Sequence, residues 1–269
     1  MRHFFIQRLC RQTVACFSVL FWGLAAFTTR AQTAPAMALL GNDPTATAYT
    51  GPRFPGGPDS LQALLTRVQR QAGPALTGEV FLRLELDDQG RTQKSYFLMP
   101  PAGSPAFALT SMPAVQVLAS QLEQLLPAWQ LGTGAPGQNK SAPTTVALPL
   151  TFGPALVPPA LNYSEESPTF PAQKFQGRPV SSLSYYVQTQ VRYPVDDLRH
   201  GRQGVVFAYF EVSETGALER RRIVGSVSPT LDAEILRVLN SLPNALTPPR
   251  QQGRPVRVGY VLPFTFRIQ

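Results

Sequence analysis

The 269-residue sequence is poor in the side chains that most active sites and metal sites use. It contains two cysteines, Cys10 and Cys16, and two histidines, His3 and His200. Because both cysteines and His3 lie near the N-terminus, the remaining chain cannot form a disulfide, a thiolate metal site or a histidine pair. It also lacks a Gly-x-Ser-x-Gly elbow and a phosphate-binding glycine loop. We therefore predict that the protein is not an enzyme and binds no metal or cofactor.

The first thirty residues have the charge and hydropathy order of an export signal. Three arginines precede the apolar residues 13–27, and the small side chains of Thr29 and Ala31 fit cleavage before Gln32. Residues 1–31 are thus predicted to be a signal peptide, and the mature protein to lie in the periplasm. The alternative is an uncleaved inner-membrane anchor, since this segment approaches the length that spans a bilayer. Membrane contact is expected only in that case.

The basic excess of the chain is modest once the signal is removed. The net charge is +8, but four arginines and no acidic residue precede Gln32, which leaves 20 basic and 16 acidic residues and a net charge of +4. Most of these arginines are scattered. Residues 220–222 form the one arginine run, which we interpret as a solvated strand or turn. Nothing in this pattern indicates a nucleic-acid partner.

Two parts of the chain resemble each other over most of their length. The matched segments, first copy before second, are residues 78–90 and 204–216, 126–127 and 242–243, and 148–152 and 262–266. The difference in residue number between matched positions falls from 126 at residues 78 and 204 to 116 at residues 127 and 243. The first copy therefore has about ten extra residues, which we place in the proline-rich residues 100–105. We predict modules at 49–153 and 170–269, joined by a proline-rich linker at 154–169.

Each copy is predicted to start with a helix, after the similar segments 54–61 and 175–183, and to continue with a β-hairpin. Apolar residues alternate along its first strand, which is typical of one buried face. They are Val80, Leu82, Leu84 and Leu86 in the first copy and Val206, Ala208, Phe210 and Val212 in the second. The residues between them, including Glu85 and Glu211, are interpreted as solvated surface. Gly90 and Gly216 supply the positive φ that a tight turn to a second strand needs.

A helix and a last strand complete each module. In the second copy Ser228 is a predicted N-cap, Pro229 suits the first helical turn, and Pro243 ends the helix. The strand at residues 256–268 contains Pro263, which cannot donate a ladder hydrogen bond and indicates a strand with a free edge. Each module is therefore predicted to be α+β, with a hairpin and a final strand forming a small antiparallel sheet packed against helices.

The second copy resembles the C-terminal domain of TonB-family energy transducers over about a hundred residues. The resemblance rests on many short motifs in the same order. They are Tyr193-Pro194, Leu198-Arg199, Gly201, residues 204–207, Gly216, residues 226–234, Leu242-Pro243, residues 253–256 and residues 260–264. The first copy is similar but degenerate, since it lacks a Tyr-Pro element and the leucine-aspartate start of the helix.

The resemblance implies a periplasmic domain that binds a box peptide of outer-membrane receptors by adding it to the sheet as a strand. Backbone groups at an exposed sheet edge support the same mode on physical grounds. The matching edge residues here are Val256, Arg257, Val258, Gly259, Tyr260, Val261 and Leu262. The family's domain also contacts receptors around the positions of Gln190, Tyr193 and Pro194. A protein partner is therefore expected, and the resemblance implies an outer-membrane TonB-dependent receptor.

The chain departs from a complete transducer in two features. Its apolar N-terminal segment contains no histidine, and it has no long spacer of alternating charge after that segment. We therefore favour a stand-alone periplasmic binding protein over an anchored energy transducer. A third reading is a structural protein, whose modules pair strands with each other or with a second copy in a homodimer and bind no receptor.

Overall fold

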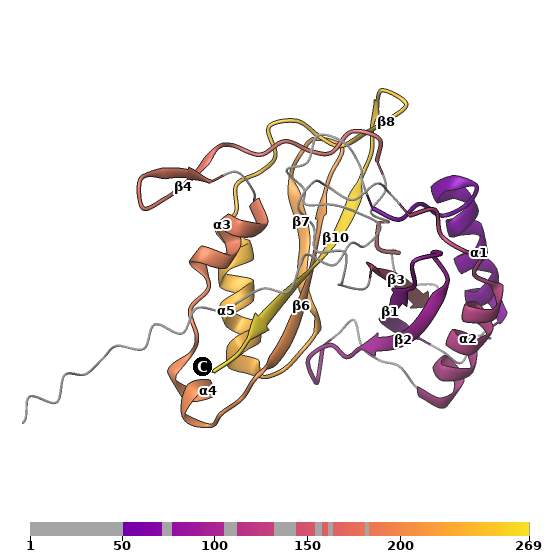
Figure 1. Ribbon diagram of the computed structural model, residues 1–269, viewed down its shortest axis with the longest axis horizontal. Coiled ribbons are helices and arrows are strands. Elements are labelled where there is room, and N and C mark those ends of the chain that lie inside the picture. The colour runs from indigo at the N-terminus through magenta and orange to yellow at the C-terminus, as the bar shows by residue number, and fades with distance from the viewer. Residues whose placement is uncertain are drawn as a thin grey trace, which may run out of the picture.

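The computed structural model describes residues 51–71, 77–104, 112–131, 144–153, 158–160, 164–180 and 183–268. The N-terminal unit, residues 51–153, contains helices α1 (Gly57–Gln71) and α2 (Met112–Leu125) and strands β1 (Gly78–Leu86), β2 (Thr92–Leu98) and β3 (Thr144–Phe152). The strands form one antiparallel sheet in the order β2-β1-β3. Both helices cover the same face of that sheet (Figure 1).

The C-terminal unit, residues 164–268, has the same arrangement around a second sheet. Its helices are α3 (Leu183–Gln190), the short α4 (Val195–Arg199) and α5 (Pro229–Asn240), and its sheet contains β6 (Gly204–Val212), β7 (Leu218–Gly225) and β10 (Val258–Phe266). The strand order is β10-β6-β7, all antiparallel. Two small hairpins, β4 (Gln173–Phe175) with β5 (Arg178–Val180) and β8 (Arg250–Gln251) with β9 (Arg254–Pro255), complete the unit.

The predicted α+β class and both hairpins are confirmed. The sequence analysis did not predict α4, β4, β5, β8 or β9, because these elements are too short for hydrophobic periodicity to show. The predicted cap of α5 is also confirmed: Ser228 lies in extended conformation and its hydroxyl accepts a hydrogen bond from the Leu231 amide, with Pro229 in the first turn. The final strand begins at Val258 rather than at residue 256.

The turn glycines of the β1-β2 and β6-β7 hairpins are each held against the chain that follows the last helix of their unit. Gly90, at φ +76°, accepts a hydrogen bond from the Trp129 amide at 2.7 Å, and Gly216, at φ +85°, accepts one from the Ala245 amide at 2.8 Å. A Cβ at Gly90 would lie 1.9 Å from the Trp129 carbonyl oxygen, and one at Gly216 would lie 2.8 Å from that of Ala245. Both positions therefore require glycine for conformation and for space.

Each unit has its own apolar core between helices and sheet. In the N-terminal unit, Trp129 is buried and its ring meets that of Phe54 edge-on at 5.2 Å. In the C-terminal unit, apolar residues of α3 and α5 pack on the helix-facing side chains of β6 and β10. These cores account for the alternating residues that the sequence analysis assigned to the buried strand faces.

The opposite faces of the two sheets pack against each other. Figure 1 shows the resulting layers: α1 and α2, the first sheet, the second sheet, then α3 and α5. The contact is a third apolar cluster of Phe81, Leu98, Ala147, Tyr209, Val224 and Val261. The expectation of one buried strand face is therefore incomplete, because Phe81 and Tyr209, on the other face, expose 1% and 0% of their surface.

Described parts of the predicted linker lie on the C-terminal unit. The Ala160 amide donates to Glu211, and the Pro158 carbonyl accepts from Arg220 at 3.1 Å. Further along, the amides of Glu165 and Glu166 donate to the Arg250 carbonyl. These stretches therefore form ordered structure, which the proline content alone did not indicate.

Among the described residues, no helix combines the length and the apolar character needed to cross a bilayer. The predicted signal peptide, residues 1–31, lies outside the described residues.

Replacing the helix cap tests the local energetics. Ser228→Ala should lower the free energy of unfolding by about 1–2 kcal/mol, because the Leu231 amide loses its acceptor. The hydroxyl also donates to the buried Asp197 at 2.7 Å. The measurement is urea unfolding of the mature protein. Ser120→Ala is the control, since its exposed hydroxyl bonds only to the Gln116 carbonyl within α2, and should change stability by less than about 0.5 kcal/mol. Equal losses in the two variants would contradict the capping role.

Candidate partner-binding surface

The predicted binding strand lies at an edge of its sheet. Val258, Gly259, Tyr260, Val261 and Leu262 are on β10, which pairs with β6 and with no other described strand. Val256 and Arg257 precede the strand. The prediction that both residues belong to the strand was wrong, because the ladder with β6 begins with the pair Val258 and Val212.

The edge is less open than the sequence analysis expected. All nine residues of β10 are buried. Tyr260 and Leu262 face the helices, whereas Val261 faces the N-terminal unit. With both faces covered, side chains on this strand offer a partner little accessible surface. An incoming strand would meet mainly its backbone.

Gly259 has a packing role that its sequence position did not reveal. A Cβ there would lie 2.4 Å from the Ala160 carbonyl oxygen and 2.5 Å from the Tyr209 hydroxyl. The chain at Ala160 therefore crosses the sheet directly over Gly259, where no side chain fits. Substitution at this position would disturb that crossing as well as any edge contact.

Arg257 belongs to a charge network centred on Glu211. Its guanidinium contacts Glu219 at 2.6 Å, Glu211 at 3.1 Å and Glu214 at 3.3 Å. The hydrogen bond to Glu219 is the main reason that the pKa of Arg257 is raised. An arginine tied to three carboxylates is held in place by its own unit. Of its three partners, Glu211 is the one that is completely buried.

Glu211 is completely buried, so the prediction that it is solvated was wrong. Its carboxylate accepts hydrogen bonds from the Tyr209 hydroxyl at 2.6 Å, Arg220 at 2.8 Å, Arg257 at 3.1 Å and the Ala160 amide at 3.1 Å. Burial by itself raises the pKa of Glu211, but the hydrogen bonds from Tyr209 and Ala160 and the charge of Arg220 outweigh it, so the pKa is lowered. The ionised form is thus favoured in the fold.

Two of the three clustered arginines also lie at this face. Arg220 bonds to Glu211, and Arg222 bonds to Glu79 of the N-terminal unit at 2.5 Å. The interpretation of this run as simply solvated was therefore wrong, because both side chains neutralise buried carboxylates. One sequence signal was present: Phe81 and Phe207 sit at strand positions otherwise assigned to the solvated face, which is typical of a sheet buried on both sides.

The other predicted contact residues lie at the opposite end of β10. Gln190 is the last residue of α3, and its carbonyl accepts from Arg237 at 2.9 Å. Tyr193 is 8% exposed, meets the Phe266 ring edge-on at 5.3 Å and donates its hydroxyl to the Arg202 carbonyl. Pro194 is the N-cap of α4. Tyr193 thus lies at the C-terminal end of β10, which is Phe266, whereas Val258 is the N-terminal residue of that strand.

The two buried tyrosines of this surface, Tyr193 and Tyr209, act as hydrogen-bond donors. Burial raises the pKa of both Tyr209 and Tyr193, so both hydroxyls stay protonated and act as donors. In the described part of the chain, no group of three or more His, Cys, Asp or Glu side chains is placed to hold a metal ion.

Residues 189–268 match the family model described as Gram-negative bacterial TonB protein C-terminal. This part of the chain is a TonB C-terminal-like domain, and it contains β6, β7, α5 and β10. The match starts within α3 and leaves the N-terminal unit outside it. Comparisons with curated proteins and with solved structures found no match.

The lowered pKa of Glu211 predicts acid sensitivity. A carboxylate whose pKa is lower folded than unfolded contributes stability above its unfolded pKa, which is 4.5 here, and loses it as the pH falls through the folded pKa. Glu211→Gln should therefore reduce the free energy of unfolding at pH 7. It should also flatten the loss of stability between about pH 5 and pH 3, measured by urea unfolding across that range.

Glu79→Gln is the control, because the pKa of Glu79 is raised, mainly by burial. Its ionised form therefore opposes folding, so its contribution is present at low pH and lost as the pH rises. The variant should lose at least as much stability on acidification as the wild type. An acid dependence in Glu211→Gln equal to that of the wild type would contradict the assignment.

Proposed function

Because residues 189–268 form a TonB C-terminal-like domain, we propose that this protein is a periplasmic protein-binding module for an outer-membrane partner. An extended segment of the partner, such as the box peptide of a TonB-dependent receptor, pairs with β10 as an additional strand. The observation that carries this proposal is the family match, which includes the whole of β10. Domains of this family are non-enzymatic interaction modules, and we propose no catalytic activity here.

The position of Pro263 supports pairing on the outer side of β10. A proline is tolerated in a strand where its nitrogen faces away from the neighbouring strand, since no ladder hydrogen bond is then lost. Pro263 is opposite Phe207 of β6. Amides two residues apart point to the same side, so the Val261 amide also faces away from β6. A partner strand would form its hydrogen bonds with the backbone groups on this outer side of β10.

Gln190, Tyr193 and Pro194 form the second part of the proposed contact. Tyr193 is nearly buried, so its role is to position the turn between α3 and α4 beside the Phe266 end of β10. Gln190 and the ring of Pro194 border this turn. A partner strand that continues past the end of β10 would reach it.

We further propose that the N-terminal unit is a diverged copy of the same module. Apart from α4 and the two small hairpins of the C-terminal unit, both units have the order helix, hairpin, helix, strand, and in both sheets the first strand of the main hairpin is central. The contacts of Gly90 with Trp129 and of Gly216 with Ala245 also recur at matching places. The first copy lacks the Tyr-Pro element that positions the α3 turn, so we assign receptor binding to the second copy.

Two alternatives remain for the whole protein. One is an inner-membrane-anchored energy transducer, which requires that residues 1–31 stay attached. The other is a structural protein that pairs strands with itself or in a homodimer. Among the described strands, none pairs between the two units, which meet through their faces. This observation favours the binding module over strand pairing between the copies.

A proline at Val261 tests the proposed edge. Val261→Pro removes the outward amide, and Val261→Ala is the matched control, because both lose the valine side chain from the contact between the sheets. We expect Val261→Pro to bind a synthetic receptor box peptide at least about tenfold more weakly than Val261→Ala by isothermal titration calorimetry. Equal affinities would place the binding site elsewhere.

Mass spectrometry of the exported protein tests its localisation. A cleaved signal peptide yields a mature chain that starts at Gln32 and is released with the periplasmic fraction. A chain that keeps residues 13–27 and fractionates with the inner membrane would support the anchored transducer instead.

A further inference from the structure

We propose that the face of the TonB C-terminal-like sheet opposite its helices is an interaction surface whose partner is the N-terminal unit. The contact is specific enough to hold the two units together without the chain that connects them. This inference goes beyond receptor binding and does not depend on it. It concerns the face of the sheet, whereas the proposed partner uses its edge.

The centre of this interface is apolar and aromatic. Phe81 of β1 and Tyr209 of β6 lie with ring centroids 5.2 Å apart. Leu98 and Ala147 on one side and Val224 and Val261 on the other surround these rings. Separation of the units would expose a contiguous apolar face on each sheet, which is unfavourable in water.

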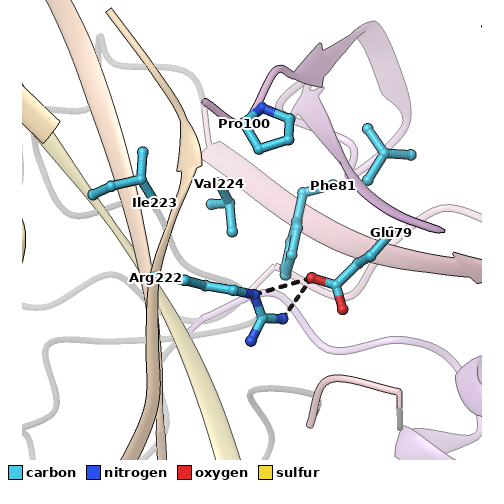
Figure 2. A pocket seen from close by; sticks show the side chains of 7 residues that line it. Glu79, Phe81, Pro100, Arg222, Ile223 and Val224 are labelled. Atoms are coloured by element: carbon cyan, nitrogen blue, oxygen red, sulfur yellow. Dashed lines mark hydrogen bonds and ion pairs between the residues drawn. The ribbon is translucent and has the colours of Figure 1, made fainter. Parts of the chain in front are cut away.

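Arg222 anchors the apolar centre to a single carboxylate. Its guanidinium lies 4.4 Å from the centroid of the Tyr209 ring and 6.0 Å from that of Phe81. Figure 2 shows its two hydrogen bonds to Glu79, from Nε at 3.1 Å and from Nη2 at 2.5 Å. A planar guanidinium that both stacks and forms a paired hydrogen bond is the type of group that dominates protein interfaces.

The packing around this anchor is close. The cavity between the units, lined by Glu79, Phe81, Pro100 and Arg222 among others, measures about 10 Å³, the space of roughly one water molecule (Figure 2). One backbone hydrogen bond also crosses the interface, from the Ser226 amide to the Met99 carbonyl at 2.8 Å. Glu79 is 6% exposed, so loss of Arg222 would leave a carboxylate in apolar surroundings.

This geometry gives the N-terminal unit a defined role. It covers the face of the binding domain and thereby prevents that face from associating with other proteins or with a second copy. A partner strand then has access to the sheet only along an edge. The loss of the Tyr-Pro element in the first copy is compatible with this role, because covering a sheet face does not require it.

Cutting the connection tests the proposal on the otherwise complete mature protein. A protease site inserted within residues 154–157 separates the units after digestion but leaves Ala160 on the second unit. We expect the two fragments to elute as one species in size-exclusion chromatography at about 1 μM. Elution as two separate species at this concentration would overturn the proposal.

Variants of the cut protein test the anchor. Arg222→Met should weaken association of the fragments at least about tenfold by analytical ultracentrifugation. Arg237→Met is the matched control, since Arg237 forms a comparable paired contact with Glu234 outside the interface and should leave association unchanged. Equal affinities for both variants would overturn the role of Arg222.

Glu79→Gln provides an independent test from the other unit. It keeps the shape of the side chain but replaces the carboxylate that accepts both hydrogen bonds from Arg222, which leaves the guanidinium at the interface without its anionic partner. It should therefore weaken association without unfolding either unit, which circular dichroism checks. Combined with Arg222→Met, it should add less than the sum of the single effects, because both remove one interaction. Fully additive effects would overturn the pairing.

Discussion

The stacking of Arg222 on Tyr209 and its pairing with Glu79 hold together the two sheets on which the rest of the structure depends. Glu79 comes from β1, the central strand of the first sheet, and Tyr209 from β6, the central strand of the second. With both central strands joined, each sheet is covered on one face by helices and on the other by its neighbour. Apolar residues can therefore occupy both faces of strands that would otherwise be half solvated.

This arrangement confines the proposed partner binding to the borders of the second sheet. β10 contributes residues to two apolar clusters and is buried along its length. Its side chains are committed to the fold, so a partner would be selected by backbone pairing and by contacts beyond the strand ends. The turn around Tyr193 lies at one of those ends, where its ring packs on Phe266. The second sheet thus has one face covered by the N-terminal unit and an edge at β10 that pairs with no other described strand.

The two buried glutamates, Glu211 and Glu79, differ in how they are neutralised. Glu211 accepts four hydrogen bonds and its pKa is lowered, whereas Glu79 has one arginine partner and its pKa is raised by burial. The difference arises because hydrogen-bond donors to a buried carboxylate have to outweigh the cost of its desolvation. Glu211 therefore favours the fold near neutral pH, and Glu79 is the less favourable of the two buried charges.

The sequence by itself determined the local features: the hairpins at Gly90 and Gly216, the cap at Ser228, the apolar faces toward the helices and the family resemblance of the second copy. These depend on neighbouring residues, periodicity and turn chemistry, which are visible in one dimension. Only the tertiary structure decided that Glu211 is buried, that Arg220 and Arg222 neutralise carboxylates, and that Gly259 makes room for Ala160. Glu79 and Arg222 are 143 residues apart in the chain. Which strand face meets another sheet depends on such distant contacts, and the alternation of apolar residues reports only one buried face at a time.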